Sequence, residues 1–209
     1  MTRIAVLVSG GGTNLQALID AQREGRLCGG EICAVISSKD NAYALERARL
    51  AGIPSDIVRR KDFPDIEKYT SEVVSALEDY DADLVVHAGY LSVLSPEYCE
   101  RYRGRALNIH PALIPSFCGK GYYGLHVHEE VLAYGVKLTG ATVHFIDETA
   151  DGGPIIAQKA IPILPDDTPE TLQQRVMAEC EQPLLKEAVA LFCAGRLRVE
   201  GRIVQVVSL

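Results

Sequence analysis

The sequence has no tryptophan, two methionines and four phenylalanines among its 209 residues. Aliphatic side chains and tyrosines must therefore supply most of the hydrophobic core. No apolar run reaches the roughly 18 residues that a membrane-spanning helix needs, so we expect no membrane partner. Lysine and arginine number 21 against 28 acidic residues, which gives a formal net charge of -7. Nucleic-acid binding requires clustered positive charge, so we expect no nucleic-acid partner.

The six cysteines form no CxxC pair and show no metal-type spacing with histidine. Cys33 and Cys193 lie in apolar segments, where a reduced thiol behaves as a small hydrophobic group. We therefore expect a reducing, cytoplasmic location. The amino terminus has one basic residue, Arg3, and no cleavage-type site of small residues, so we predict no signal peptide.

Strand-like and helix-like patterns alternate along the first half of the sequence. Strands are expected at residues 3–9, 31–37, 56–59, 83–87 and 106–110, and helices at 14–24, 42–51, 64–80 and from Ser95-Pro96 onward. The run at 3–9 is continuously apolar, which is typical of a strand buried on both faces. This alternation predicts an α/β fold with a mainly parallel, Rossmann-like sheet flanked by helices.

The pattern changes after His110, where we expect a C-terminal extension with a mixed sheet. A loop rich in glycine and tyrosine is followed by an expected helix at 126–134, β-rich runs at 139–146 and 154–164, a long helix at 169–193, and a hairpin at 197–199 and 202–207. Pro183 lies inside the long helix. Its missing N–H and its ring predict a kink or break there.

Asn108 and His110 end the strand expected at 106–110, and Pro111 stops it. Alternate strand residues face the same side, so both side chains share a face at the carboxyl edge, where open α/β sheets bind ligands. An amide can donate to an oxyanion, and an imidazole can move a proton near neutral pH. The pair therefore fits acyl-type transfer. The alternative is a terminal Asn and His that only satisfy loop carbonyl groups.

Asp151 opens the stretch Asp151-Gly152-Gly153-Pro154. Its carboxylate can orient an imidazole, or accept a proton directly or through a water. The alternative is a simple hairpin turn between two apolar runs.

Three glycines, at residues 10–12, join the first strand to the first helix. Such a loop lets the backbone approach a ligand closely, and the helix N-terminus behind it favours an anion. Thr13 or Asn14 can cap the helix or contact phosphate oxygens. Leu15 stands where a dinucleotide motif needs glycine, and the lysine of a P-loop is missing, so a phosphate monoester fits better than a pyrophosphate. The alternative is a glycine-rich turn without a ligand.

With these features in place, the chain resembles the folate-dependent phosphoribosylglycinamide formyltransferase family over nearly its whole length. The strongest blocks are SGGGTNLQAL at 9–18, AGYLSVLSP at 88–96, NIHPALIP at 108–115, GATVHF at 140–145 and DGGPII at 151–156. NIHP followed by DGGP is typical of formyl-folate transferases. The resemblance implies transfer of a formyl group from 10-formyltetrahydrofolate to the amine of 5-phosphoribosylglycinamide in de novo purine biosynthesis.

The resemblance also implies roles for individual residues. Asn108, His110 and Asp151 would stabilise the tetrahedral intermediate and manage the proton transfer. The ribonucleotide would contact Gly11, Gly12, Thr13, Asn14 and one of Glu179 and Glu181. The folate would contact Leu91, Ser92, Val93, Leu94, Asn108, His144, Asp147, Glu148, Thr149, Ala150 and Asp151. No metal is implied.

The sequence departs from the family pattern at three places. Leu91-Ser92 replaces a Met-Arg pair, so an arginine contact to folate is missing. Residues 118–124 look like an insertion. A late Glu-His pair is replaced by Glu179-Cys180-Glu181, so two glutamates compete for one role. We expect one domain over 1–209, with a phosphate-binding half at 1–110 and a folate-binding half at 111–209, as a monomer or homodimer.

Three other functions stay open at this stage. A hydrolase would release formate from the same folate, although that relative carries an extra N-terminal domain. A transferase acting on methionyl-tRNA would need a further C-terminal domain and a basic surface. A non-catalytic sensor of phosphoribosyl ligands would use only the glycine loop. His87 is expected to be a hydrogen-bonded core histidine, and His126 and His128, without a third ligand, are not expected to bind a metal.

Overall fold

The computed structural model describes residues 1–208, and the strands within this range form one nine-stranded sheet. The first half contains β1 (Thr2–Val8), α1 (Thr13–Arg23), β2 (Gly30–Ser37), α2 (Tyr43–Ala51), β3 (Ser55–Ile57), the 3-10 helix η1 (Arg60–Asp62), α3 (Ile66–Asp79), β4 (Leu84–His87), α4 (Pro96–Arg101) and β5 (Ala106–His110). The second half contains α5 (Leu125–Tyr134), β6 (Leu138–Phe145), β7 (Ile155–Pro162), α6 (Pro169–Val176), the π-helical turn η2 (Met177–Glu181), α7 (Gln182–Cys193), β8 (Leu197–Glu200) and β9 (Ile203–Val206).

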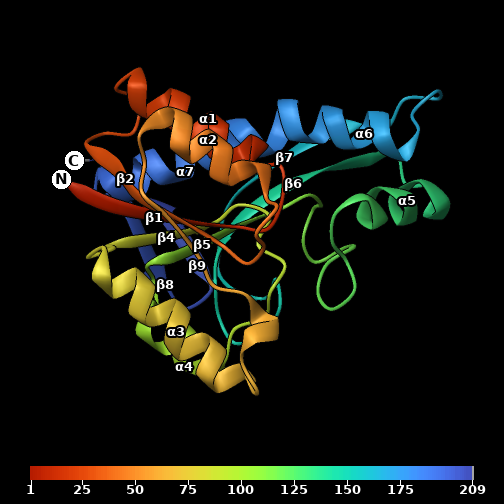
Figure 1. Ribbon diagram of the computed structural model, residues 1–209. Coiled ribbons are helices and arrows are strands. Elements are labelled where there is room, and N and C mark those ends of the chain that lie inside the picture. The colour runs from red at the N-terminus through yellow and green to blue at the C-terminus, as the bar shows by residue number, and fades with distance from the viewer. Residues whose placement is uncertain (209) are drawn as a thin grey trace.

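The strand order is β3-β2-β1-β4-β5-β6-β7-β9-β8. The strands from β1 to β5 pair in parallel, whereas β6 runs antiparallel to both β5 and β7. At the far edge, β9 is parallel to β7 and antiparallel to β8. Helices α1, α2 and α7 lie on one face of the sheet, and α3 and α4 lie on the other (Figure 1). The predicted Rossmann-like fold with a mixed C-terminal extension is therefore confirmed.

Strand β1 shows why its sequence is apolar at consecutive positions. Ile4, Val6 and Val8 pack into the hydrophobic core on one face of the sheet, and Ala5 and Leu7 pack into the core on the other. All five side chains are fully buried. A strand covered by helices on both faces cannot show apolar–polar alternation.

The sequence predicted a kink or a break at Pro183, and the long C-terminal helix does not break there. Helices α6 and α7 are continuous through the π-helical turn at Met177–Glu181, which lies just before the proline. Proline cannot donate to the carbonyl of residue 179, four positions earlier, and its ring crowds that turn. The wider turn accommodates both problems without ending the helix.

Helix α1 begins at Thr13, and neither Thr13 nor Asn14 caps it, so contact with phosphate oxygens is the alternative that stays a prediction for these two residues. Gly12 occupies the N-cap with a φ of 71°. A Cβ at this position would lie 2.7 Å from the Cβ of Ala44 in α2. Glycine is therefore required where the loop contacts α2, both by conformation and by space.

Among the helices of residues 1–208, none combines the length and apolar content needed to cross a bilayer.

The β6–β7 pair provides a test of this packing. A Cβ added to Gly140 would lie 1.9 Å from the carbonyl oxygen of Lys159 on β7. We expect Gly140→Ala to lower the free energy of unfolding by about 1–3 kcal/mol, because the strands must separate locally. Urea unfolding measures the change, with Gly10→Ala as control, since a Cβ at Gly10 meets nothing within 4 Å. Equal effects of the two variants would contradict the assigned packing of β6 on β7.

Candidate active site

Strands β5 and β6 carry polar side chains on one face at the carboxyl end of β5. In the antiparallel register, Asn108 lies opposite His144, and His110 lies opposite Thr142. Alternate residues share a face, so the four side chains form one polar patch, while their neighbours on both strands pack into the core. The sequence predicted the shared face of Asn108 and His110. The register of β6 adds the other two residues.

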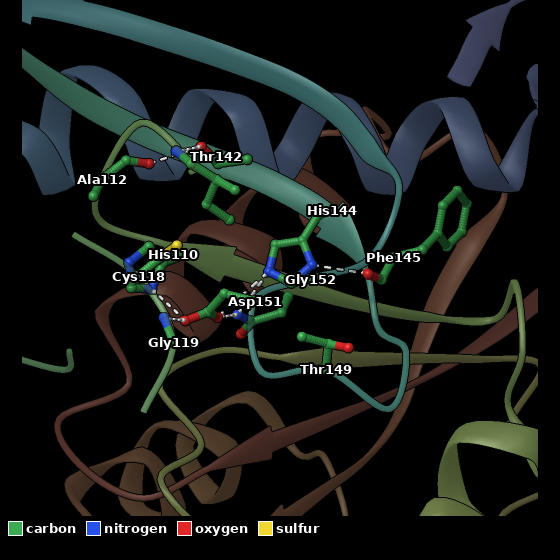
Figure 2. Close-up of polar contacts among 12 residues, drawn as sticks. His110, Ala112, Cys118, Gly119, Thr142, His144, Phe145, Thr149, Asp151 and Gly152 are labelled. Carbon is green, nitrogen blue, oxygen red and sulfur yellow. Dashed lines mark hydrogen bonds and ion pairs between the residues drawn. The ribbon is translucent and has the colours of Figure 1, made fainter. Parts of the chain in front are cut away.

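Asp151 lies at the centre of this patch (Figure 2). Its Oδ1 accepts from Asn108 Nδ2 at 3.3 Å and lies 3.6 Å from His144 Nε2. Its Oδ2 accepts from the Gly119 N–H at 2.8 Å and lies 3.5 Å from His110 Nδ1. Residues far apart in the sequence therefore converge on one carboxylate.

The turn that carries Asp151 is compact because of the glycines after it. Asp151 has a φ of 53°, in the left-handed region. A Cβ on Gly152 would lie 2.5 Å from the Cβ of Thr149, and one on Gly153 would lie 1.8 Å from the carbonyl oxygen of Phe145. The two glycines therefore let the turn fold tightly onto the end of β6.

His144 is held in one tautomer by its neighbours. Its Nδ1 donates to the carbonyl oxygen of Phe145 at 2.8 Å. In the neutral ring, Nε2 then carries a lone pair, and it accepts from Asn108 Nδ2 at 3.2 Å. The amide of Asn108 is thereby oriented with its N–H groups toward His144 and Asp151.

His110 is also held, but toward the following loop. Its Nε2 donates to the carbonyl oxygen of Phe117 at 2.8 Å, so the lone pair of Nδ1 faces Asp151 in the neutral ring. Burial lowers the pKa of His110, and the opposing effects of Asp151 and the Phe117 carbonyl do not restore it. Its N–H is therefore occupied by a loop carbonyl group.

Asp151 remains ionised despite its burial. Burial by itself raises the pKa of the carboxyl group, but the contact with His144, the charge of His110 and the Gly119 N–H outweigh that effect. The pKa of Asp151 therefore lies below its usual range. A buried carboxylate whose ionised form is favoured in this way can take up a proton only transiently, which suits a proton relay.

The first of two cavities at this edge, cavity A, lies beside Asn108, His144 and Asp151. It has a volume of about 280 Å³ and is lined by residues 92–94 and 146–151, together with those three side chains and others. Ser92, Val93, Leu94, Asp147, Glu148, Thr149 and Ala150, all predicted to contact folate, thus surround one cavity. Leu91 is the exception.

The second cavity, cavity B, lies at the glycine loop and has a volume of about 290 Å³. Its lining includes residues 10–14, which contain the predicted Gly11, Gly12, Thr13 and Asn14. Glu181 and Leu91 also line it, so the structure places Leu91 in cavity B and not with its neighbours in cavity A.

The two cavities share walls. Along the segment after β4, Gly89 and Leu91 line cavity B, whereas Tyr90 and Ser92 line cavity A. Strand β5 does the same, because Asn108 lines cavity A and Ile109 lines cavity B. Neighbouring residues of both segments thus line different cavities, so the two cavities adjoin along these segments.

The helix geometry gives Glu179 and Glu181 different surroundings. Glu181 is buried and accepts from Asn14 Nδ2 at 2.9 Å. Glu179 is exposed and lies 3.5 Å from Arg175 Nε. Residues two apart on a helix point in nearly opposite directions, so only one of them can face cavity B. Glu181 therefore lines cavity B and Glu179 does not, and the contact of either glutamate with the ribonucleotide stays a prediction.

Several lining residues were not predicted from the sequence. His87 and Tyr98 line cavity A, and His87 Nε2 lies 2.7 Å from the Tyr98 hydroxyl. The prediction of a hydrogen-bonded, buried His87 is confirmed, but its place in a cavity wall was missed. Gln173 and His128 line cavity B. No local pattern marks these residues, because packing between distant elements brings them to the cavities.

The expected insertion at residues 118–124 lies against the polar patch. Gly119 donates to Asp151, and the preceding Phe117 accepts from His110. His126, just after the loop, is exposed and lies 3.2 Å from Glu129 Oε2, whereas His128 is buried. The two histidines therefore face different environments. Within residues 1–208, no group of three or more His, Cys, Asp and Glu side chains is arranged to hold a metal ion.

Comparison with known proteins identifies the family of this chain. A family model described as formyl transferase matches residues 2–189. The chain therefore belongs to the formyl transferase family and is an enzyme of that family. It is 39% identical over 196 residues to the phosphoribosylglycinamide formyltransferase of Escherichia coli (strain K12), covering 94% of this chain and 89% of that protein.

Other relatives extend the comparison. The chain is 45% identical over 197 residues to the trifunctional purine biosynthetic protein adenosine-3 of Drosophila pseudoobscura pseudoobscura, but it spans 14% of that protein. Among solved structures, glycinamide ribonucleotide transformylase 1 from Symbiobacterium toebii has a TM-score of 0.93 and 42% identity, covering 100% of this chain and 95% of that one. A formyltetrahydrofolate deformylase from Pseudomonas syringae pv. tomato has a TM-score of 0.88 and 26% identity, covering 99% of this chain and 66% of that one.

The buried carboxyl group of Glu181 should make the free energy of unfolding depend on pH. Burial raises the pKa of Glu181 from 4.5 to about 7, and the Asn14 amide only partly opposes it. Between these values the folded protein binds more protons than the unfolded chain, so stability falls as pH rises. Between pH 4.5 and pH 7 the ionisation of Glu181 should lower the free energy of unfolding of the wild type by up to about 3 kcal/mol. Glutamine does not ionise, so Glu181→Gln should not show this decrease.

Urea unfolding at pH 4.5 and pH 8 measures this change for the wild type and for Glu181→Gln. Glu179→Gln is the matched control, because its carboxyl group is exposed two residues away. A wild-type stability that falls no more steeply than that of Glu181→Gln would show that Glu181 ionises as an ordinary glutamate.

Proposed function

We propose that the protein transfers the formyl group of 10-formyltetrahydrofolate to the amine of 5-phosphoribosylglycinamide, a step of de novo purine biosynthesis. The observation that carries this proposal is the wall shared by cavities A and B, with Asn108 on one side of it and Ile109 on the other. A transferase with two substrates needs two binding spaces that meet at its reactive groups. The full-length similarity to phosphoribosylglycinamide formyltransferases supports the same reaction.

The ribonucleotide is assigned to cavity B. The N-terminus of α1 opens onto this cavity behind the glycine loop, and backbone N–H groups there favour a phosphate monoester. Glu181 and Asn14 line the same space, where their oxygens can accept from sugar hydroxyl groups. In this arrangement the amine end of the ribonucleotide reaches the shared wall.

The folate is assigned to cavity A. Val93, Leu94 and Ile146 provide apolar contact surface, and the turn at residues 147–151 provides polar groups beside it. Ser92 stands in this wall where the family pattern has an arginine, so it offers a hydroxyl group in place of a positive charge. Binding here brings the formyl group to Asn108, His144 and Asp151.

The chemistry follows from these positions. The neutral amine attacks the formyl carbon and forms a C–N bond, which places negative charge on the formyl oxygen. Asn108 donates to that oxygen when one of its N–H groups leaves His144 or Asp151, a contribution that is typically about 2.7–4 kcal/mol for one such donor. A proton then leaves the attacking nitrogen and reaches the folate nitrogen as the C–N bond to folate breaks. Asp151 holds that proton, directly or through a relay water.

His110 affects the proton transfer through its contact with Asp151. Its Nδ1 lone pair faces the carboxylate, so a proton taken up between them would be shared by both groups. Donation from His110 to the formyl oxygen would require release of its Nε2–H from the Phe117 carbonyl. Asn108 must also release a hydrogen bond, but it lines cavity A, whereas His110 does not, so we assign oxyanion stabilisation mainly to Asn108 with His110 as a supporting group.

We infer one domain in which residues 1–110 supply most phosphate contacts and residues 111–209 supply most folate contacts, in a monomer or homodimer. All six cysteines are free thiols, which fits a reducing cytoplasm.

An assay of tetrahydrofolate release tests the activity itself. With 10-formyltetrahydrofolate present, we expect release to depend on added 5-phosphoribosylglycinamide, because the amine is the acceptor. Release of formate at the same rate without the ribonucleotide would favour the hydrolase alternative. This alternative is tested because the fold is also similar to that of a formyltetrahydrofolate deformylase.

Asp151 provides the test of mechanism. Asp151→Asn keeps the shape of the side chain but cannot hold the proton, so we expect kcat to fall about 10²–10⁴-fold with binding of both substrates retained. Single-turnover kinetics measure the formyl transfer. Asp166→Asn, an exposed carboxyl group outside both cavities, is the control. Near-normal turnover of Asp151→Asn would remove this residue from the mechanism.

A further inference from the structure

His128 in α5 is completely buried and lines cavity B. Among residues 1–208, neither of its ring nitrogens has a hydrogen-bond partner. A neutral imidazole carries an N–H donor and an acceptor nitrogen, and burying both without partners costs free energy. Buried polar groups in folded proteins are normally paired, so this histidine calls for a partner that the chain itself does not supply.

A second unpartnered group lines the same cavity. Asn14 is buried, and its Nδ2 donates to Glu181, but no residue within 1–208 donates to its Oδ1. Asn14 lies in α1 and His128 lies in α5, so the two groups come from different elements. Two independent, unsatisfied polar groups in one cavity indicate a polar ligand that supplies both hydrogen-bond donors and acceptors.

We propose that His128 is a binding residue for the ribose of 5-phosphoribosylglycinamide, exchanging a hydrogen bond with a sugar hydroxyl group. This inference rests on the proposed function and deepens it. The Oδ1 atom of Asn14 accepts from a hydroxyl group of the same sugar. Both unsatisfied groups thereby gain partners only when the ribonucleotide is bound.

The protonation state of His128 favours a hydroxyl group over a phosphate. Burial lowers its pKa to about 4, and the charge of His110 acts in the same direction. The ring is therefore neutral near pH 7, with one donor and one acceptor. A hydroxyl group can both donate and accept, whereas an ionised phosphate offers mainly acceptor oxygens.

The ring can reach the ligand without a change in the backbone. Histidine χ2 is broad and roughly two-fold, so rotation about the Cβ–Cγ bond exchanges the positions of ring nitrogens and carbons. His128 lies on α5, whose N-cap residue Gly124 also lines cavity B. Ligand binding therefore needs only a rotamer adjustment at this site.

The test compares His128→Leu with His126→Leu. His126 is an exposed residue two positions earlier in the same helix. Thermal unfolding is measured for the wild type and both variants, without ligand, with 5-phosphoribosylglycinamide, and with inorganic phosphate. Steady-state kinetics give KM for each substrate. Should His128→Leu fail to fold, His128→Gln and His128→Phe make the same comparison of a polar with an apolar side chain.

We expect His128→Leu to raise the unfolding temperature of the ligand-free protein by about 2–4 °C, because an unpaired polar group is removed. The stabilisation by ribonucleotide should fall strongly, while that by inorganic phosphate persists. KM for the ribonucleotide should rise about tenfold or more, with KM for folate unchanged. His128→Gln, which keeps a donor and an acceptor, should recover part of the affinity.

The opposite results overturn the inference. If the ribonucleotide raises the unfolding temperature of His128→Leu as much as that of the wild type, His128 is a structural residue and does not bind the ligand. Loss of the phosphate effect together with the ribonucleotide effect would show a phosphate contact in place of a ribose contact. A wild-type protein that gains no stability from the ribonucleotide would instead overturn the proposed function itself, and this inference with it.

Discussion

The antiparallel pairing of β6 with β5 is the constraint on which the site depends. It reverses the direction of an otherwise parallel run and places His144 opposite Asn108. Strand β6 therefore ends beside the start of β5, with Phe145 opposite Leu107. The turn that follows folds back over this face of the sheet and delivers Asp151 to the polar patch.

The two buried carboxyl groups show how neighbours decide ionisation. Asp151 is surrounded by an amide, a backbone N–H and two histidines, and its pKa lies below the usual range despite burial. Glu181 has the single amide of Asn14, and burial raises its pKa to about 7. Desolvation disfavours the charge in both cases, and only at Asp151 do the neighbouring histidines and hydrogen-bond donors together outweigh it. One site is therefore set for proton transfer and the other for hydrogen bonding.

Sequence patterns predicted most of the fold and part of the site. The periodicity identified the strands and helices to within a few residues, because each depends on a short contiguous segment. The shared face of Asn108 and His110 followed from alternation along one strand. The continuity of the helix across Pro183 did not follow, because it depends on a π-helical turn just before the proline. That same turn ends at Glu181, the glutamate that faces cavity B.

The sequence by itself determined the element order, the two-sided burial of β1 and the type of chemistry available at the end of β5. These properties depend on residues that are close together in the chain. Tertiary structure decided that Glu181 faces the glycine loop and that the His110 N–H meets the Phe117 carbonyl. It also decided that His128 lines cavity B without a hydrogen-bond partner among the described residues, 1–208. Each of these outcomes depends on the packing of one element against another. Local periodicity carries no information about such contacts, since strand register and helix packing are set by the whole core.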